Sequence, residues 1–432
     1  MNAEILAVGT ELLMGQIANT NAQYITARLQ EVGINIYYHT VVGDNPERLT
    51  ETLKQCLKRS DVVIMTGGLG PTQDDLSKET VAALFGKKLI LHEPTAEAIK
   101  AFFGKAGREM TPNNIKQAYM PENSTILENP RGTAPGYIVE GCIGGDSSGK
   151  SCVGAATTSA RRAVVLLPGP PREMCPMFDQ CVMPWLSKKS STIIKSKFLK
   201  IFGIGESALE HLIKDIIQRE KIPKMAMYAK EGQVLLRITA SADSECEAEE
   251  LIKPVVREIE ERLGDRLYSV DNEELHEVVF KLLKAKNLKI ALAESCTGGL
   301  ISSTLVNIPG VSEVLERAVV CYSNESKIDM LGVSGATLDA HGAVSRETAE
   351  EMAKGIAERG MADIGVSVTG IAGPDGGTPE KPVGLVYIGL YAKGGVSYVR
   401  KIQIEGERAR VRNSAMLNAF DIVRRHLLGL PL

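Results

Sequence analysis

The sequence predicts two separate α/β domains with mainly parallel sheets, joined by a small α+β module. The main observation is a recurring unit: a short β-branched run, then a Gly-rich polar loop, then a segment of helical periodicity. The unit occurs three times in the N-terminal part of the chain and three times in the C-terminal part. Continuous apolar strands alternating with helices form parallel sheets covered on both faces. Ligands of such sheets bind at the carboxyl ends of the strands, so we expect one site in each domain.

The six units define the elements that carry these sites. In the N-terminal part, the strands are 5–8, 62–65 and 164–167, leading into GTELLMGQ, TGGLGPTQDD and PGPPRE. In the C-terminal part, they are 290–293, 318–322 and 364–368, leading into ESCTGG, SNESK and TGIAGPDGG. We therefore predict domains at 1–170 and 268–432, with the small module at 171–267.

The module between the two domains shows a different pattern. A strand at 197–201 and a helix carrying Leu209, Leu212, Ile213 and Ile216 are followed by an alternating strand at 234–240 and a helix at 247–263. Residues 192–265 hold 12 Lys and Arg against 14 Asp and Glu. A nucleic-acid module should carry a basic face, so we expect a structural role.

Two helices and one insertion complete the predicted elements. The last domain opens with an amphipathic helix, in which Leu275, Val278, Val279, Leu282 and Leu283 recur at helical spacing. A later helix runs from an N-cap at Ser345 to a C-cap at Gly360 and buries Ala349, Met352, Ala353 and Ile356. Residues 141–162 are rich in Gly, Ser, Thr and Ala, and we expect a surface insertion without chemistry.

Composition excludes several classes of protein. The chain has 432 residues, 50 Lys and Arg against 53 Asp and Glu, and 44% hydrophobic residues, which argues against a basic nucleic-acid coat and against disorder. No apolar run approaches the ~18 residues of a membrane span, and the N-terminus lacks the pattern of a signal peptide. Eight cysteines contain no CxxC pair, which argues against a zinc ribbon or a disulfide framework. We therefore expect a cytoplasmic protein without a membrane partner.

The loop GGLGPTQDD is the candidate site of the N-terminal domain. Gly67, Gly68 and Gly70 allow backbone amides to approach an anionic ligand. Asp74 and Asp75 supply hard oxygen ligands for Mg²⁺ or a similar ion, and Glu11 could bring a third carboxylate to the same rim. The alternative is a tight turn before a helix, where the helix dipole favours aspartate by itself.

In the C-terminal domain, Ser295 follows a strand and precedes Thr297, Gly298, Gly299 and a helix. Such a serine is exposed at a strand-to-helix turn, where nearby amides can hold an oxyanion. Lys327 begins the helix after the neighbouring strand and is the candidate base, with Tyr322 to orient it or relay a proton. Cys296 is the rival nucleophile. Taken singly, an N-cap serine, a surface lysine and a half-buried tyrosine are the plain structural alternatives.

Two further groups could contact a substrate of this site. In TGIAGPDGG we expect contacts from Thr369, Gly370, Ala372 and Gly373. Arg408, Arg410 and Arg412 open the last helix at alternate positions, so they cannot all share one face. At least one arginine can reach a phosphate, and the others are expected on a solvated face.

The motifs VGTELLMGQIANTN, GGLGPTQDD, RGTAPG and LPGPPRE resemble, in this order, the N-terminal domain of the CinA family (competence/damage-inducible protein A). That domain is similar to the molybdopterin-binding fold. The resemblance implies metal-dependent ADP-ribose pyrophosphatase activity, with a phosphate-bearing ligand near Gly67, Gly68, Gly70 and Thr72 and the divalent metal near Asp74 and Asp75. The insertion at 141–162 is longer than we expect for the family.

The motifs AESCTGG, CYSNESK, GAVS, TGIAGPDGG, KPVG and GERARVR resemble the CinA C-terminal domain, the family of nicotinamide mononucleotide deamidases. The resemblance implies that Ser295 is the nucleophile, Lys327 the general base, Tyr322 an assisting residue and Arg408 a residue near the substrate. No cofactor is implied at this site. The middle module of full-length CinA proteins is KH-like; this one is acidic and lacks a GxxG loop, so RNA binding is not implied.

Together the two resemblances imply a bifunctional enzyme of pyridine-nucleotide salvage. One site would convert nicotinamide mononucleotide to nicotinate mononucleotide and ammonia, and the other would cleave the pyrophosphate of ADP-ribose. We expect small-molecule nucleotides as its partners, no nucleic acid, and a homodimer. Two alternatives stay open: an N-terminal domain that only senses a nucleotide or pterin, and a partner in DNA uptake or repair.

Overall fold

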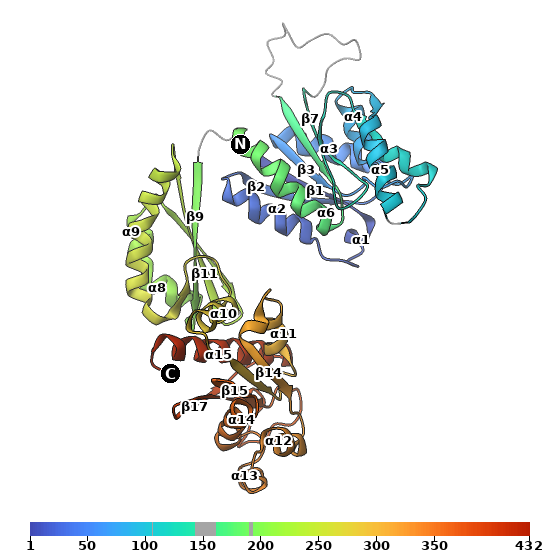
Figure 1. Ribbon diagram of the computed structural model, residues 1–432. Coiled ribbons are helices and arrows are strands. Elements are labelled where there is room, and N and C mark those ends of the chain that lie inside the picture. Colours follow the sequence, from blue (N-terminus) through green and yellow to red (C-terminus); the bar gives the residue numbers. More distant parts are fainter. Residues whose placement is uncertain (106, 143–160, 190–192) are drawn as a thin grey trace. The chain divides into compact units, whose positions relative to one another are not determined.

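The computed structural model describes the chain except residues 106, 143–160 and 190–192 (Figure 1). It divides into two compact units, Met1–Lys195 with Ser241–Glu249, and Ser196–Ala240 with Glu250–Leu432. Both units contain sheets with parallel strands, which confirms the predicted α/β class. Most of the predicted insertion at 141–162 lies outside the described residues.

The first unit is built on a six-stranded sheet of order β2-β1-β3-β8-β7-β6. Its strands are β1 (Asn2–Val8), β2 (Asn35–Val42), β3 (Val62–Thr66), β6 (Thr125–Leu127), β7 (Gly136–Gly141) and β8 (Arg162–Leu167). The first four strands in this order pair parallel, and β7 and β6 continue the sheet antiparallel. The three predicted N-terminal strands are therefore neighbours, and their polar loops leave the same edge.

Helices cover both faces of this sheet (Figure 1). They are α1 (Thr10–Leu13), α2 (Thr20–Glu31), α3 (Pro46–Arg59), α4 (Ser77–Leu84), α5 (Glu93–Lys105), α6 (Pro171–Met177) and α7 (Met183–Lys189), beside a hairpin of β4 (Leu89–Leu91) and β5 (Tyr119–Pro121). Side chains alternate across β1, so Ile5 packs toward α2 and α6, whereas Leu6 packs toward α3. Both faces of β1 are therefore buried, as the continuous apolar run predicts.

The first unit extends beyond the predicted boundary at residue 170. The core that contains Ile5 and Ile64 also buries Met174 of α6, Leu186 of α7, and Phe178 in the segment between these two helices. This segment is apolar on the side that faces the sheet, and separating it would expose that surface to water. The α6–α7 segment thus belongs to the first unit rather than to the middle module.

The second unit contains two sheets. The module has a four-stranded sheet of order β10-β11-β9-β12, formed by β9 (Ile193–Phe202), β10 (Lys224–Lys230), β11 (Gln233–Ala242) and β12 (Leu267–Ser269), with helices α8 (Glu206–Arg219) and α9 (Glu245–Leu263). The other sheet has the order β14-β13-β15-β16-β17, formed by β13 (Ile290–Glu294), β14 (Leu315–Val320), β15 (Ile364–Gly370), β16 (Leu385–Ala392) and β17 (Val396–Gln403).

The five-stranded sheet is half parallel. Strand β13 pairs parallel with β14 and β15, whereas β16 and β17 add an antiparallel hairpin that the sequence interpretation lacked. Its helices are α10 (Leu275–Lys286), α11 (Leu300–Val306), α12 (Asn324–Leu331), α13 (Gly335–His341), α14 (Arg346–Arg359) and α15 (Arg408–Leu428). The predicted caps of α14 are confirmed, with the Ser345 side chain accepting a hydrogen bond from the Thr348 amide and Gly360 at the C-cap.

The module and the five-stranded sheet share one hydrophobic core. Phe202 of β9 and Tyr268 of β12 pack in the cluster that contains Leu275 of α10 and Phe420 of α15. Because apolar surface from both segments is removed from water together, they form one folding unit. The predicted boundary between residues 267 and 268 therefore runs through a core.

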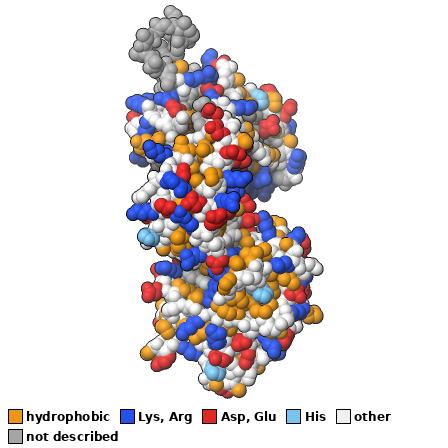
Figure 2. Space-filling view, turned by 90° about the vertical axis from the view of Figure 1, so that its left-hand side faces the viewer, with side chains coloured by type: hydrophobic (Ala, Val, Ile, Leu, Met, Phe, Trp, Pro, Cys, Tyr) orange, Lys and Arg blue, Asp and Glu red, His pale blue; other side chains and the backbone are white. Residues whose placement is uncertain are grey.

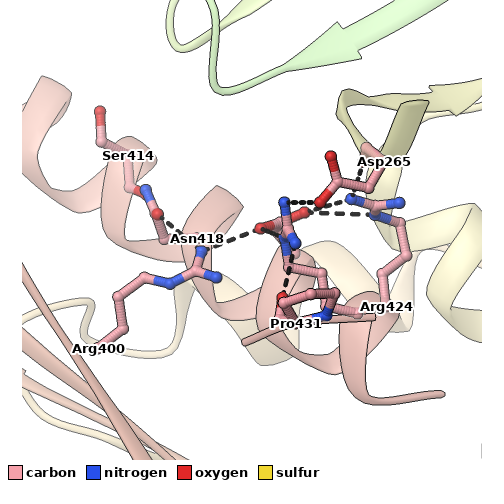
Figure 3. A network of polar contacts seen from close by, with 8 residues as sticks. Asp265, Arg400, Ser414, Asn418, Arg424 and Pro431 are labelled. Carbon is pink, nitrogen blue, oxygen red and sulfur yellow. Dashed lines mark hydrogen bonds and ion pairs between the residues drawn. The ribbon is translucent and has the colours of Figure 1, made fainter. Parts of the chain in front are cut away.

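A polar network reinforces this union (Figure 3). The buried carboxylate of Asp421 accepts hydrogen bonds from Arg400 at 2.9 Å, Arg424 at 2.7 Å and Arg425 at 3.1 Å. Arg424 also donates to the backbone carbonyl of Asp265 at 2.8 Å, and Arg425 forms an ion pair with the Asp265 carboxylate at 2.6 Å. The network ties α15 to the 3₁₀ turn at Gly264–Arg266, immediately before β12.

Charged side chains of both signs are interspersed on the face that Figure 2 shows. No single-sign field covers that face, which agrees with the net charge of -3. Within the described parts of the chain, every helix is too short or too polar to serve as a membrane span.

Candidate active site

The serine predicted as nucleophile lies in the turn between β13 and α11. Ser295 directly follows the last residue of β13, and its amide donates to the Val368 carbonyl of β15 at 3.0 Å. Gly298 and Gly299 follow with φ of 60° and 90°, the left-handed region that glycine adopts without steric cost. The Ser295 residue is only 8% exposed, so it is buried and not exposed as predicted. The two parallel strands thus bring the serine to the carboxyl edge of the sheet.

Lys327 reaches this serine from the neighbouring helix. Its residue is 1% exposed, although lysine is almost never fully buried without partners. Its Nζ lies 3.3 Å from Ser295 Oγ and donates to the carbonyls of Cys321 at 2.9 Å and Tyr322 at 3.1 Å. Ser323 caps α12 through its side chain, and its carbonyl lies 3.4 Å from the same Nζ. The arrangement holds the amine on the serine hydroxyl.

Burial lowers the pKa of the Lys327 ammonium below its ordinary value of 10.5. Desolvation disfavours the charged form of a buried amine, and the neutral form has a lone pair. With two N–H bonds directed at backbone carbonyls, that lone pair can face the Ser295 hydroxyl. A serine next to a neutral amine is the arrangement of an activated nucleophile.

Cys296 is a poor rival for this role. Burial raises the pKa of its thiol to about 11, so the reactive thiolate is scarce at neutral pH. Burial likewise raises the pKa of the neighbouring Cys321 thiol. Both side chains pack among apolar residues, Cys296 in one core cluster and Cys321 in another. Their environment is that of structural cysteines.

Tyr322 and Arg408 lie together at the rim. The tyrosine follows β14 by two residues instead of ending the strand, and it is 63% exposed. Its backbone carbonyl contacts Lys327, whereas its hydroxyl lies 3.4 Å from Arg408 Nη2. Arg408 also donates to the Gly373 carbonyl at 2.8 Å. Tyr322 therefore orients the lysine through its main chain, and its ring is free to meet a ligand.

The Gly-rich loop after β15 contributes mainly structure. The Thr369 hydroxyl donates to the Ala343 carbonyl at 2.7 Å, and Ala372 is buried in the core. A side chain at Gly370 would collide with the Leu385 carbonyl, 2.7 Å from an ideal Cβ. Of the four residues predicted to touch substrate, Gly373 is the one that adjoins Arg408.

Of the backbone amides predicted to hold an oxyanion, one already donates a hydrogen bond within the turn. The Gly298 amide already donates to the Ser295 carbonyl at 3.0 Å, which closes the turn. Within the described residues, the amides of Cys296, Thr297 and Gly299 have no such partner in the protein. Thr297 is fully buried, and its Oγ1 has no hydrogen-bond partner there either. The free amides are the candidates for holding an oxyanion.

Two side chains hold this turn in roles that the sequence did not predict: Glu294 was not a candidate, and Arg412 was considered only as one of three arginines that could reach a phosphate. Glu294, the last residue of β13, is buried and accepts from the Ile301 amide at 3.0 Å and the Ser302 amide at 2.8 Å. Arg412 of α15 donates to the Thr297 carbonyl. A charged residue inside an otherwise apolar strand was the available signal for Glu294, but the contact of Arg412 spans 115 positions in the sequence.

In the N-terminal domain, the loop GGLGPTQDD closes on itself. Gly67 and Gly68 have φ of 103° and 68°, and an ideal Cβ on either would lie 2.2 Å from a neighbouring oxygen. The Asp75 carboxylate accepts from the Thr72 amide at 3.0 Å and from the Thr72 hydroxyl at 2.5 Å, against Gly70. The close packing of the loop therefore explains the glycines, and loop closure explains Asp75, without reference to a ligand.

The predicted cluster of three carboxylates is not formed. Glu11 folds over Gly9 of its own loop, Asp75 is engaged by Thr72, and Asp74 is exposed. Across the described residues, no group of three or more His, Cys, Asp and Glu side chains could hold a metal ion. The side chains present do not fit the expected metal site, because Thr72 engages one oxygen of Asp75 and the other two carboxylates do not gather with it.

A cavity of about 300 Å³ lies at the carboxyl ends of β1 and β3. Glu11, Thr66 and Gly169 line it, together with Asn21. The Asn21 Nδ2 donates to Thr66 Oγ1 at 2.8 Å and to the Gly169 carbonyl at 2.7 Å, while its Oδ1 is buried without a partner in the described residues. The sequence interpretation placed the site on the Gly-rich loop and missed Asn21, although ANTN stands in the quoted motif.

Three family models match successive parts of the chain. Residues 4–188 match the probable molybdopterin binding domain, 196–269 the damage-inducible protein CinA KH domain, and 272–427 the CinA C-terminal domain. A CinA-like protein from Dictyoglomus thermophilum is 52% identical over 430 residues and covers both chains fully. The solved structure of the competence/damage inducible protein CihA from Agrobacterium tumefaciens is 41% identical over 34% of this chain and 91% of that chain, with a TM-score of 0.34.

A putative competence-damage inducible protein from Acetivibrio thermocellus is 55% identical over 430 residues, which is 100% of both chains. Similarity of this extent covers both sheets, the module and the serine and lysine loops. The chain belongs to the CinA family.

Proposed function

We propose that this protein is a hydrolase that converts nicotinamide mononucleotide to nicotinate mononucleotide and ammonia. The observation that carries the proposal is the distance of 3.3 Å between the buried Lys327 Nζ and Ser295 Oγ. Amide hydrolysis needs a nucleophile, a base and donors for the oxyanion, and this turn offers all three. The resemblance of the C-terminal motifs to nicotinamide mononucleotide deamidases supplies the substrate.

The reaction follows from the roles of two side chains. Neutral Lys327 takes the Ser295 proton as Oγ attacks the carboxamide carbon, and free amides of the turn hold the oxyanion. The lysine ammonium then gives that proton to the leaving nitrogen, which departs as ammonia and leaves an ester on Ser295. Water attacks the ester with Lys327 again as base, and nicotinate mononucleotide leaves. The two side chains supply both nucleophile and base, so the scheme calls for no metal ion.

The test is ammonia release from nicotinamide mononucleotide by the full chain, with Ser295→Ala as the matched control. We expect release by the parent protein in the presence of a chelator and none above background by the variant. A parent protein without activity, or a variant with full activity, would contradict the proposal.

For the N-terminal domain we propose hydrolysis of the ADP-ribose pyrophosphate. The observation that favours it is the cavity beside Glu11, Asn21 and Thr66, at the edge where ligands of parallel sheets bind. Because the expected carboxylate cluster is not formed, we derive no step through a metal ion. Release of AMP from ADP-ribose, with and without a divalent metal, distinguishes hydrolysis from binding alone by a nucleotide or pterin sensor.

Three further expectations are carried as proposals. We propose that the protein acts in the cytoplasm, which the absence of a CxxC pair among its eight cysteines supports, and that it forms a homodimer. We propose no nucleic-acid partner, because charges of both signs alternate and the module is acidic. A salt-dependent affinity for DNA at physiological ionic strength would overturn this last proposal.

A further inference from the structure

The nucleophile turn is held from two sides by charged side chains that the reaction scheme does not use. On one side, the Glu294 carboxylate binds the first turn of α11 through the Ile301 amide at 3.0 Å and the Ser302 amide and hydroxyl, both at 2.8 Å. This carboxylate joins the end of β13 to the start of α11. The five residues 295–299 therefore leave and re-enter regular structure at fixed points.

On the other side, Arg412 of α15 takes the carbonyl in the middle of the turn. Its Nε and Nη2 donate to the Thr297 oxygen at 3.2 Å and 2.7 Å. Hydrogen bonds from a charged donor are stronger than those between neutral groups. Thr297 itself is fully buried, so its carbonyl has little access to water as an alternative partner.

The held carbonyl belongs to the same peptide unit as the Gly298 amide. That amide donates to the Ser295 carbonyl at 3.0 Å, across the turn. Because a peptide unit is planar, fixing its oxygen also fixes the direction of its N–H. Arg412 therefore acts on the main chain of Ser295 through one rigid peptide plane.

We propose that Arg412 is a positioning residue for the nucleophile, which holds Ser295 Oγ within reach of Lys327 by anchoring the Thr297–Gly298 peptide. The inference rests on the proposed function of this site. A phosphate-binding role is the competing assignment, but both described hydrogen bonds of Arg412 go to a carbonyl. Arg408, exposed at the rim, is the arginine with access to a ligand.

The experiment compares Arg412→Ala and Arg412→Lys with Arg410→Ala. Arg410 is exposed on the same helix, so its removal subtracts the same charge without touching the turn. Each protein is assayed with nicotinamide mononucleotide and with nicotinamide riboside, which lacks the phosphate. Labelling of Ser295 by a fluorophosphonate gives a third readout that needs no substrate.

A misplaced nucleophile costs on the order of 10²-fold in rate. We therefore expect Arg412→Ala to lower kcat for nicotinamide mononucleotide and the labelling rate by that factor, with KM changed little. Whatever activity the parent shows on the riboside should fall equally. Arg412→Lys, with one donor group in place of the fork, should fall between Arg412→Ala and the parent. Arg410→Ala should keep parent values in all three assays.

Two results with the Arg412 variants would overturn the inference. A raised KM for the mononucleotide alone, with normal labelling, assigns Arg412 to the phosphate, and unchanged kcat and labelling in both Arg412 variants remove any role. Thermal melts establish whether each variant is folded. If Arg412→Ala does not fold, Arg412→Lys still tests the inference. If the parent releases no ammonia, the proposed function fails, but the labelling rates still decide the role of Arg412. If Ser295 of the parent is not labelled, both the proposed function and the role of Arg412 are overturned.

Discussion

Replacing Lys327 by methionine removes the ε-amine while keeping a long apolar side chain in its place. Among the described residues, Lys327 Nζ is the hydrogen-bond partner of Ser295 Oγ, so the variant leaves the serine without a base. Nucleophile and base act as one unit, and loss of either typically lowers kcat by 10⁴-fold or more. That factor corresponds to about 5.4 kcal/mol of transition-state stabilisation. We expect Lys327→Met and Ser295→Ala each to reach it.

The same substitution also affects stability. The amine donates to the buried carbonyl of Cys321 at 2.9 Å and to that of Tyr322 at 3.1 Å, and methionine can donate to neither. A buried acceptor left without a donor costs about 1–3 kcal/mol. Removing the need to bury an amine offsets part of this loss. The variant should therefore melt at a lower temperature yet remain folded, as near-ultraviolet circular dichroism would show.

The assay is ammonia release, with nicotinate mononucleotide identified by chromatography, at a temperature where every variant is folded. The double variant Ser295→Ala/Lys327→Met should be no slower than either single variant, because each substitution alone already disables the nucleophile and base that act together. Cys296→Ala should stay within about tenfold of the parent, since its thiol is protonated and buried. An active Ser295→Ala beside a dead Cys296→Ala, or a Lys327→Met that keeps a tenth of the parent rate, would refute the assignment.

Three other predictions follow from the same structure. Lys327 accepts a proton only when it is neutral, and burial lowers its pKa below 10.5, so kcat/KM should rise with pH with a midpoint below that value; a midpoint at or above 10.5 would contradict this. Asp75→Asn should lower the melting temperature, because Asp75 closes its loop, whereas Asp74→Asn, at an exposed position, should leave it unchanged, and both variants should spare ammonia release. An unchanged melting temperature in Asp75→Asn would contradict the role of this carboxylate in the loop. A fragment of residues 196–432 should unfold cooperatively and release ammonia without added metal, whereas 268–432 should melt lower, since it lacks part of the shared core; full inhibition by a chelator would count against the Ser–Lys scheme.

The sequence predicted the elements that local rules determine. The six strands were found because continuous β-branched runs and the loops after them are local signals, and α14 was placed by its own caps at Ser345 and Gly360. The antiparallel hairpin of β16 and β17 was missed. The sequence of β16, LVYIGLYA, is an apolar run like those of the predicted strands, so the local signal was present. The serine and lysine could be paired because their strands are neighbours in one parallel sheet.

Contacts between distant segments could not be read in this way. Arg412 was grouped with two other arginines by position alone, and its contact with Thr297 depends on the packing of α15 beside α11. The carboxylates of the N-terminal loop failed as a metal site for a similar reason. Residue spacing shows that Asp75 is near Asp74. It does not show that the Thr72 hydroxyl donates a hydrogen bond to the Asp75 carboxylate.

The shared core of the second unit has a consequence for synthesis on the ribosome. The core cluster around α2, α6 and α7 in the first unit is complete in sequence by Leu186. Phe202, by contrast, belongs to a core cluster that is complete only after α15, with Phe420, has been translated. At ~5–20 residues per second, that interval lasts roughly 10 to 40 s. Throughout it, the module presents an uncovered aromatic surface, so translation speed and chaperone access should govern the yield of the second unit far more than that of the first.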